Sequence, residues 1–297
     1  MTNTVACQID YNPTAASEWG PRLPKSACLP INRCNLPAVI LGGLTFQQHP
    51  APLLLDGVAE LHSDLFPLLE RLSDPAERAR QFMDYMTVHF RLEALEDAGL
   101  IPHHQATESH WNKLKLRGRA DYLRMVRGWA FDTNSREGAV MKAWVESRFG
   151  LLTHYHGALL NDRTEEAYER FLVICGQGLY NTNALEAQLD LLYTYCQYEL
   201  HRQQPEQTHL TLYRGFNSLC DDQILYKIDR HHRIVLLNNL SSFSTRRERA
   251  EEFGDHMMKT QVPVSKIFFY NRLLPGMLKG EDEFVVIGGI YEVEWLA

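Results

Sequence analysis

The sequence predicts an α+β fold, with a helical N-terminal part followed by a mostly β C-terminal core. Two observations predict this fold. Apolar residues recur at helical spacing in several stretches before residue 204, whereas after Pro205 they alternate or form short runs typical of strands. The chain has 297 residues, of which 45% are hydrophobic, and this is enough for a large core. The expected division is an irregular segment over 1–35, a mainly helical part over 36–204 and the β core over 205–297.

Four helices are expected in the helical part. Asp74 and Pro75 are typical of a helix start, because Asp caps free N–H groups and Pro fits the first turn. Ser135 is a similar cap, and Gly150 is typical of a helix end. Many prolines fall in residues 1–70, which predicts loops and short turns there. The expected helices cover Asp74–Gly99, Ser135–Gly150, a stretch from Thr164 onward, and Asn183–Arg202.

The C-terminal core is expected to hold short strands and one helix. Val293 and Trp295 alternate with glutamates, which predicts a strand with one buried face. Gly254 follows a charged stretch and is typical of a helix end. The expected strands are Leu210–Tyr213, Ile234–Leu237, Val262–Tyr270 and Phe284–Glu294, and the expected helix is Arg246–Phe253.

Composition and missing motifs argue against several classes of protein. The formal net charge is −7, whereas nucleic-acid binders are usually basic. No apolar stretch is long enough to span a membrane, and no secretory signal is present. The six cysteines form no C-x-x-C pair, so we expect reduced thiols in a cytoplasmic protein. Dinucleotide-fold, P-loop and zinc-protease motifs are absent, and we expect no metal site.

Three short segments of the β core contain candidate site residues. Arg214 lies at the end of the first expected strand, Ser244 and Thr245 precede the expected helix, and Glu281 and Glu283 enter the last strand. Each segment alone is weak evidence, because an arginine, a serine cap or an acidic turn is common on a protein surface.

In this order, the three segments resemble the arginine–serine–glutamate class of mono-ADP-ribosyltransferases. Within that class the chain is similar to the dinitrogenase reductase ADP-ribosyltransferases of nitrogen-fixing bacteria. The similarity extends from about residue 36 to the C-terminus. It is carried by the segments Leu41–Phe46, Tyr85–Phe90, Asn183–Tyr198 and Leu278–Glu283.

The resemblance implies transfer of ADP-ribose from the co-substrate NAD to an arginine, with release of nicotinamide. Glu283 would stabilise the oxocarbenium-like transition state, and Glu281 would orient the acceptor guanidinium. Ser244 would hydrogen-bond Glu283. Ser242 is an alternative, because the class often reads Ser-Thr-Ser and position 246 is arginine here.

The remaining candidate residues would bind NAD. Arg214 would fix the pyrophosphate, and Gly215 would let the backbone approach the nicotinamide amide. Thr245 belongs to the same motif as Ser244. Phe253 would pack on the nicotinamide ring, although a core phenylalanine is an equally good interpretation.

The resemblance also implies partners: dinitrogenase reductase as protein substrate and a PII signal protein as regulator. Modification would switch off nitrogen fixation. Two alternatives are an NAD glycohydrolase with water as acceptor, and a degenerate module that only binds NAD or a partner. The presence of Glu281 argues against an enzyme that only hydrolyses NAD, because hydrolysis does not need a second carboxylate. The presence of the arginine, the serine and both glutamates argues against a degenerate site, which would be free to lose them.

Two further features have structural explanations as well as functional ones. Three tyrosines fall on the expected helix Asn183–Arg202, and core packing ranks ahead of adenine binding for them. The basic stretch from Lys113 to Arg127 is a solvated helix face or a docking patch for an acidic protein surface.

Overall fold

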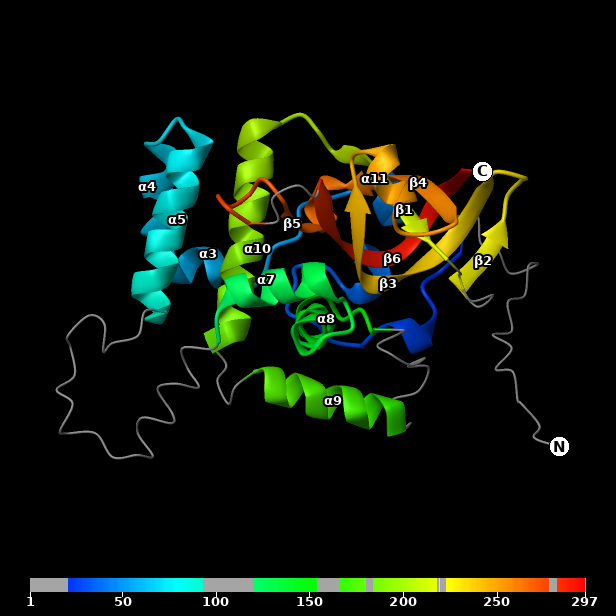
Figure 1. The fold of residues 1–297 in the computed structure, drawn as a ribbon, viewed down its shortest axis with the longest axis horizontal. Helices are drawn as coiled ribbons and strands as arrows, with labels where there is room; N and C mark the ends of the chain where they lie inside the picture. Colours follow the sequence, from blue (N-terminus) through cyan, green and yellow to red (C-terminus); the bar gives the residue numbers. More distant parts are fainter. Residues whose placement is uncertain are drawn as a thin grey trace.

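The computed structural model of the protein describes residues 21–92, 120–153, 166–179, 184–217, 219, 223–277 and 282–296. Its first half is helical, and its C-terminal part forms a six-stranded antiparallel sheet (Figure 1). The predicted α+β class is therefore confirmed. Secondary structure changes from helix to strand between Gln203 and His209, close to the predicted boundary at 204/205. The functional division at that boundary stays a prediction.

Short helices replace some of the loops expected before residue 70. Each spans only three to six residues, which is too short for apolar periodicity to show in the sequence. Buried side chains such as Leu41, Phe46 and Leu65 hold them against the core, since helices this short have little stability alone. They are η2 (Lys25–Ala27), α1 (Ala38–Leu41), α2 (Leu44–Gln48), α3 (Val58–Leu61) and α4 (Leu65–Glu70).

The long helices follow the predicted caps. The Asp74 side chain accepts a hydrogen bond from the Ala76 N–H, and Ser135 accepts one from Gly138. Gly150 ends its helix with φ of +70°, as a left-handed C-terminal residue. The helices are α5 (Pro75–Phe90), α7 (Tyr122–Phe131), α8 (Arg136–Phe149), α9 (Glu166–Gly178) and α10 (Ala184–Gln203).

Two helix predictions need comment. The first long helix ends at Phe90, with Arg91 in the left-handed region at φ of 53°, so the expected extension to Gly99 is wrong. Helix α7 was not among the four expected helices. Thr164, Asn183 and the basic residues 113–119 lie outside the described residues, whereas Arg124 and Arg127 are exposed on α7.

Helix α10 is the central helix of the fold. Figure 1 shows it standing between α5 and the sheet, with α8 and α9 along the lower side. Tyr193 and Tyr195 are fully buried, and Tyr195 stacks on Phe82 with ring centroids 4.0 Å apart. The Tyr193 hydroxyl donates to the Ser265 carbonyl oxygen at 2.8 Å. This burial confirms core packing for these two tyrosines.

The strands extend further than the sequence predicted. Val262–Tyr270 was expected as one strand, but a 3-10 turn divides it, because Pro263 lacks the N–H that a continuing strand needs. The elements are β1 (His209–Phe216), β2 (Ile224–Lys227), β3 (His232–Ser244), α11 (Arg247–Glu251), β4 (His256–Pro263), η4 (Val264–Lys266), β5 (Ile267–Tyr270) and β6 (Glu283–Leu296).

The strand pairing brings the three motif segments together. The strand order is β2-β3-β1-β4-β6-β5, and an added pairing of β3 with β6 closes β3, β1, β4 and β6 into a ring. In this ring Tyr213 lies opposite Ser244, and Ser244 lies opposite Glu283. The end of β1, the end of β3 and the start of β6 therefore meet at one place.

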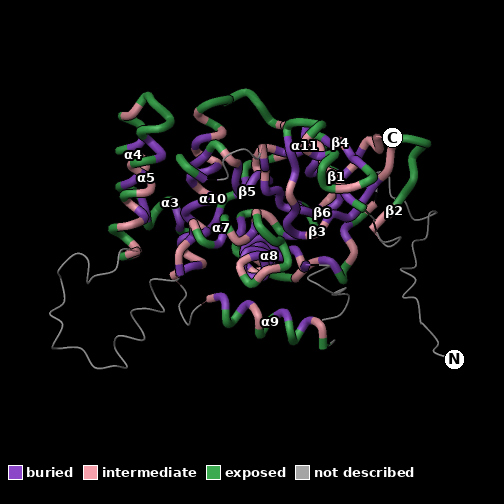
Figure 2. Tube along the Cα trace, in the orientation of Figure 1, coloured by how far each residue is buried: buried purple, intermediate pink, exposed green. Residues whose placement is uncertain are grey.

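The helical part and the sheet share one hydrophobic core. Buried residues, purple in Figure 2, run through α8 and α10 and continue into β3, β5 and β6. The Trp144 ring on α8 lies 4.9 Å from the Phe268 ring on β5. Gln47 on α2 also joins the sheet, accepting the Glu292 N–H at 2.7 Å and donating to Thr260 at 2.9 Å.

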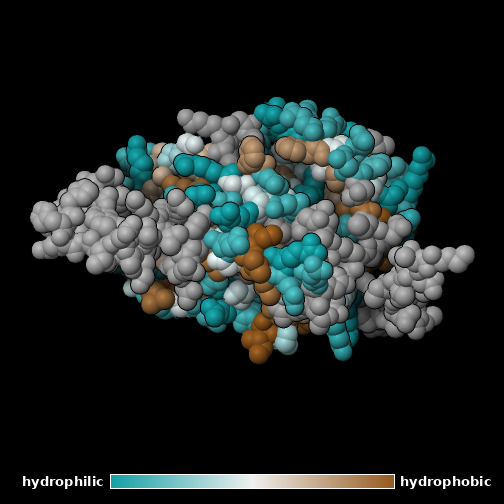
Figure 3. Space-filling view, turned by 60° about the horizontal axis from the view of Figure 1, so that its bottom comes forward, coloured by the Kyte–Doolittle hydropathy of each residue, from teal (hydrophilic) through white to brown (hydrophobic). Residues whose placement is uncertain are grey.

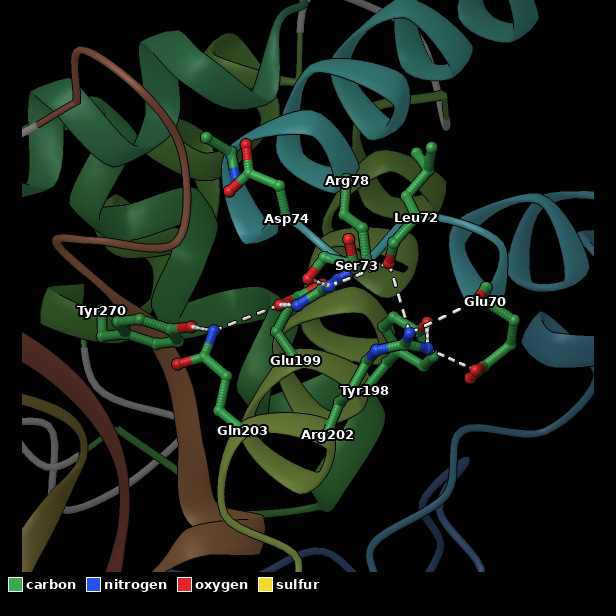
Figure 4. A network of polar contacts seen from close by, with 11 residues as sticks. Glu70, Leu72, Ser73, Asp74, Arg78, Tyr198, Glu199, Arg202, Gln203 and Tyr270 are labelled. Atoms are coloured by element: carbon green, nitrogen blue, oxygen red, sulfur yellow. Dashed lines mark hydrogen bonds and ion pairs between the residues drawn. The ribbon is translucent and has the colours of Figure 1, made fainter.

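A buried ion pair joins α5 to α10. The Arg78 guanidinium donates to both carboxylate oxygens of Glu199, at 2.6 and 2.8 Å, and to the carbonyl oxygens of Leu72 and Ser73 (Figure 4). Arg78 and Glu199 are almost completely buried. Helix α5 is thus held to the central helix by a bidentate charged contact.

One face of the molecule is drawn as a space-filling view in Figure 3. On the face drawn in Figure 3, hydrophobic residues form small separated groups among hydrophilic ones. Among the residues that the structure describes, no helix is long and apolar enough to cross a membrane.

Candidate active site

Glu283 is the first residue of β6 and is 9% exposed. Its Oε1 atom accepts a hydrogen bond from the Ser242 hydroxyl at 2.6 Å and another from the Trp129 indole N–H at 3.2 Å. The same indole N–H lies 3.0 Å from the Ser242 Oγ atom. Two donors thus fix the orientation of this carboxylate.

The strand geometry explains why serine meets glutamate here. Ser244 lies directly opposite Glu283 in the β3–β6 pairing, and Ser242 is two residues away on the same strand. Residues two apart on a strand face the same side, so both serines share the face of Glu283. Either could reach the carboxylate on spacing alone.

In the structure the hydrogen bond to Glu283 comes from Ser242, the alternative to Ser244. The functional role of either serine stays a prediction. The Ser244 Oγ atom instead accepts a hydrogen bond from the Arg246 N–H at 3.1 Å. This local serine turn forms because β3 ends there and α11 begins directly after it. Ser244 is therefore used in the strand-to-helix turn.

Arg214 approaches the same place from β1. Its Nη1 atom donates to the Ser242 carbonyl oxygen at 2.7 Å, and its guanidinium lies 5.8 Å from the Phe243 ring centroid. Burial lowers the pKa of Arg214, while the negative charge of Glu283 opposes that shift. Ser242 thus contacts Arg214 through its backbone and Glu283 through its side chain.

Trp129 and Lys142 were missed by the sequence analysis. Trp129 belongs to α7, and Lys142 belongs to α8 and is 2% exposed. The Lys142 ammonium donates to the Asn134 side chain at 3.1 Å and lies 5.9 Å from the Trp129 ring centroid. Burial lowers its pKa to about 8; nearby Asp132 opposes the shift. The sequence around Trp129 and Lys142 has no motif that predicts their place beside the candidate site, because tertiary packing of their helices brings them there.

The structure gives Gly215 a packing role. A Cβ atom at this position would lie 1.9 Å from the Ala250 carbonyl oxygen on α11. Only glycine allows this close contact between β1 and α11. The predicted approach to nicotinamide is not tested by this geometry and stays a prediction.

Phe253 and Thr245 are exposed. Phe253 follows α11 and is 66% exposed, so its alternative interpretation as a core residue is wrong. Thr245 lines a pocket of about 240 Å³ together with Phe284 and Tyr270. Phe284 is next to Glu283 on β6, so strand alternation points it to the opposite face. Thr245 thus lies at a pocket that Phe284 lines and Glu283 does not.

The second predicted glutamate, Glu281, lies outside the described residues. Its neighbour Asp282 is placed, and its carboxylate lies 3.6 Å from Arg246 and 3.8 Å from Arg272. Both arginines are exposed, so these are surface ion pairs with Asp282. The sharing of one strand face by Glu281 and Glu283 stays a prediction.

Another pocket lies away from this site. It has a volume of about 550 Å³, and its lining residues include Gln47, His209, Lys259 and Glu292, none of which was predicted as a site residue. Among the described parts of the chain, no group of three or more His, Cys, Asp and Glu residues could hold a metal ion.

Comparison with known proteins agrees with the resemblance found in the sequence. The family model described as dinitrogenase reductase ADP-ribosyltransferase matches residues 31–295. The chain is also similar to the NAD(+)–dinitrogen-reductase ADP-D-ribosyltransferase of Rhodospirillum rubrum, with 38% identity over 265 residues, which cover 89% of this chain and 93% of the relative. No solved structure matches the chain. Since the matches cover nearly the whole sequence, the chain belongs to the dinitrogenase reductase ADP-ribosyltransferase family.

Proposed function

We propose that this protein transfers ADP-ribose from NAD to an arginine of dinitrogenase reductase, releases nicotinamide and so switches off nitrogen fixation. The observation that carries the proposal is the meeting of Arg214, Ser242 and Glu283 on three neighbouring strands. Family membership supports the same activity, because the relative from Rhodospirillum rubrum is named for it.

Glu283 is the catalytic carboxylate in this proposal. Cleavage of the nicotinamide–ribose bond builds positive charge on the ribose, as in glycoside hydrolysis. A fixed carboxylate beside that charge stabilises the transition state more than the ground state. The two hydrogen bonds to Oε1 hold Glu283 in place before NAD arrives, so little reorganisation is needed during the reaction.

Arg214 and its neighbours form the NAD-binding part of the proposal. The half-buried guanidinium of Arg214 is suited to the pyrophosphate, since it offers several donors in a fixed plane. Phe253 is exposed beside α11 and is accessible for stacking on a nicotinamide ring. Gly215 and Thr245 keep their predicted NAD-binding roles as proposals.

Labelled NAD and purified dinitrogenase reductase test the proposed function directly. We expect label on one arginine of the target, identified by peptide mapping, together with release of nicotinamide. Release of nicotinamide without labelled protein would favour the glycohydrolase alternative. Binding of NAD without turnover would favour the degenerate binding module.

Glu281→Gln should lower transfer to arginine more than it lowers hydrolysis of NAD. The physical reason is that the second carboxylate orients the acceptor guanidinium, which water does not need. Both activities are measured side by side in one preparation. An equal loss of both would assign Glu281 to bond cleavage instead of acceptor orientation.

Ser242→Ala should lower kcat about 10-fold, because a hydrogen bond to a charged group is removed from Glu283. Ser244→Ala is the matched control, since it lies on the same strand face but bonds the Arg246 N–H. We expect its kcat to stay within about twofold of the original protein. A larger loss of kcat in Ser244→Ala than in Ser242→Ala would show that Ser244, and not Ser242, is the serine that positions Glu283.

Regulation by a PII signal protein is part of the proposal, from the family resemblance. Purified PII protein should raise the rate of dinitrogenase reductase modification, measured with labelled NAD. We also propose a cytoplasmic location. The described cysteines support it, because Cys28, Cys34, Cys175 and Cys196 are all free thiols.

A further inference from the structure

We propose that Trp129 is a positioning residue for Glu283, so that the helical half of the chain supplies part of the active site. This inference rests on the proposed function, in which Glu283 is the catalytic carboxylate. It extends that function beyond the three strand motifs, none of which contains Trp129. The two residues are 154 positions apart in the sequence.

Three atoms form a closed triangle of polar contacts. The Trp129 Nε1 atom lies 3.2 Å from Glu283 Oε1 and 3.0 Å from Ser242 Oγ, and the two oxygens are 2.6 Å apart. The indole N–H can only donate a hydrogen bond. It therefore reinforces the position of the carboxylate and of the serine hydroxyl together.

Burial makes this contact strong and directional. Trp129 is completely buried, and Glu283 is 9% exposed. Away from water, a hydrogen bond to a carboxylate is electrostatically stronger than at the surface. A large ring packed on all sides also has little freedom to rotate, so its N–H stays aimed at the carboxylate.

The surroundings of α7 hold the ring in register with the sheet. Gln188 on α10 accepts the Tyr122 N–H and donates to the Ala120 carbonyl oxygen, both at 2.9 Å. Gly128, next to Trp129, packs so closely on α8 that a Cβ atom there would lie 2.5 Å from the Glu137 side chain. Helices α8 and α10 thus fix α7 at both ends.

Trp144 offers a matched control within the same chain. It is also buried, and its indole N–H also donates to a carboxylate, Asp190 on α10, at 2.7 Å. That carboxylate binds Arg148 and is not part of the strand motifs. Trp144→Phe therefore removes a buried indole hydrogen bond to a carboxylate, as Trp129→Phe does, but leaves the hydrogen bonds of Glu283 intact.

The experiment compares Trp129→Phe and Trp144→Phe in the full chain, with NAD hydrolysis and transfer to an arginine analogue as assays. We expect Trp129→Phe to lower kcat about 10-fold with KM for NAD within about twofold, because a donor to a charged group is lost. Trp144→Phe should keep kcat within about twofold. Equal kcat in Trp129→Phe and the original protein would overturn the inference.

A double variant separates positioning from simple packing. Trp129 and Ser242 both act on one oxygen of Glu283, so the kcat loss in the double variant with Ser242→Ala should be smaller than the product of the single losses. A purely multiplicative loss would mean that Trp129 acts independently of the carboxylate, and it would overturn the inference.

A Trp129→Phe variant that does not fold is replaced by benzothienylalanine at position 129, which keeps the ring size and lacks the N–H. The same loss of kcat is expected, and wild-type kcat would overturn the inference. Failure of the proposed function gives a different result. The original protein would then label no acceptor. Without hydrolysis of NAD as well, both proposals would fall together, whereas hydrolysis alone would favour the glycohydrolase alternative and leave the kcat test of Trp129 in place.

Discussion

Glu283→Gln should lower the rate of ADP-ribosyl transfer by about 10²–10³-fold and leave the fold intact. Glutamine keeps the size of the side chain and one carbonyl oxygen. That oxygen can still accept from Ser242 and Trp129, so the local packing is preserved. In the proposed mechanism, the substitution removes the negative charge beside the developing oxocarbenium ion, which is the main catalytic contribution proposed for this residue.

The measurement is kcat for transfer to dinitrogenase reductase and for hydrolysis of NAD, with a thermal melt of each protein. Glu294→Gln is the control, because Glu294 lies on the same strand and makes a partly exposed ion pair with Lys259 at 2.7 Å. Such pairs contribute little to stability, and we expect unchanged kinetics. Glu283→Gln with kcat within tenfold of the original protein would show that another group supplies the charge.

The sequence predicted the strands of the candidate site better than the contacts between them. Alternation of Val293 and Trp295 with glutamates indicated the last strand, and the order of Arg214, Ser244 and Glu283 indicated the resemblance to the class. Side chains on a strand alternate between its two faces, so Ser242 and Ser244 face the same side, and the sequence could not show which of them contacts Glu283. The choice depends on where α11 begins, since Arg246 binds Ser244 through its backbone N–H.

The contribution of α7 could not be predicted from the sequence. Trp129 reaches Glu283 only because α8 and α10 place α7 against β3 and β6, and such tertiary contacts leave no local pattern. The caps of α8 show the opposite case. Ser135 and Gly150 act within a few residues of their own positions, so local chemistry was enough to place both ends.

Helix length shows the same limit. The sequence placed the start of α5 at Asp74 and Pro75, where capping is local, but placed its end at Gly99. The helix ends at Phe90, where Arg91 takes a left-handed conformation at φ of 53°. Nothing in its residue type predicts this, because arginine is an ordinary helix former.

Arg78→Leu should lower the free energy of unfolding by about 3–5 kcal/mol, because it leaves the Glu199 carboxylate buried without its cation. Glu199 is 1% exposed, and in the folded protein it receives two hydrogen bonds from Arg78 (Figure 4). Gln203 gives one further bond to Glu199, at 3.1 Å, and cannot neutralise the charge. Urea unfolding of the full chain gives the measurement.

The double variant Arg78→Leu with Glu199→Leu tests the cause of that loss. If the cost comes from an unpaired buried charge, removal of both charges should recover most of the stability, since apolar residues of similar size replace buried ion pairs well. Arg170→Ala breaks an exposed pair with Glu166 and should cost less than about 1 kcal/mol. A double variant as unstable as Arg78→Leu would show that the stability is lost with the bonds from Arg78 to the Leu72 and Ser73 carbonyl oxygens, just before α5, and not with charge pairing.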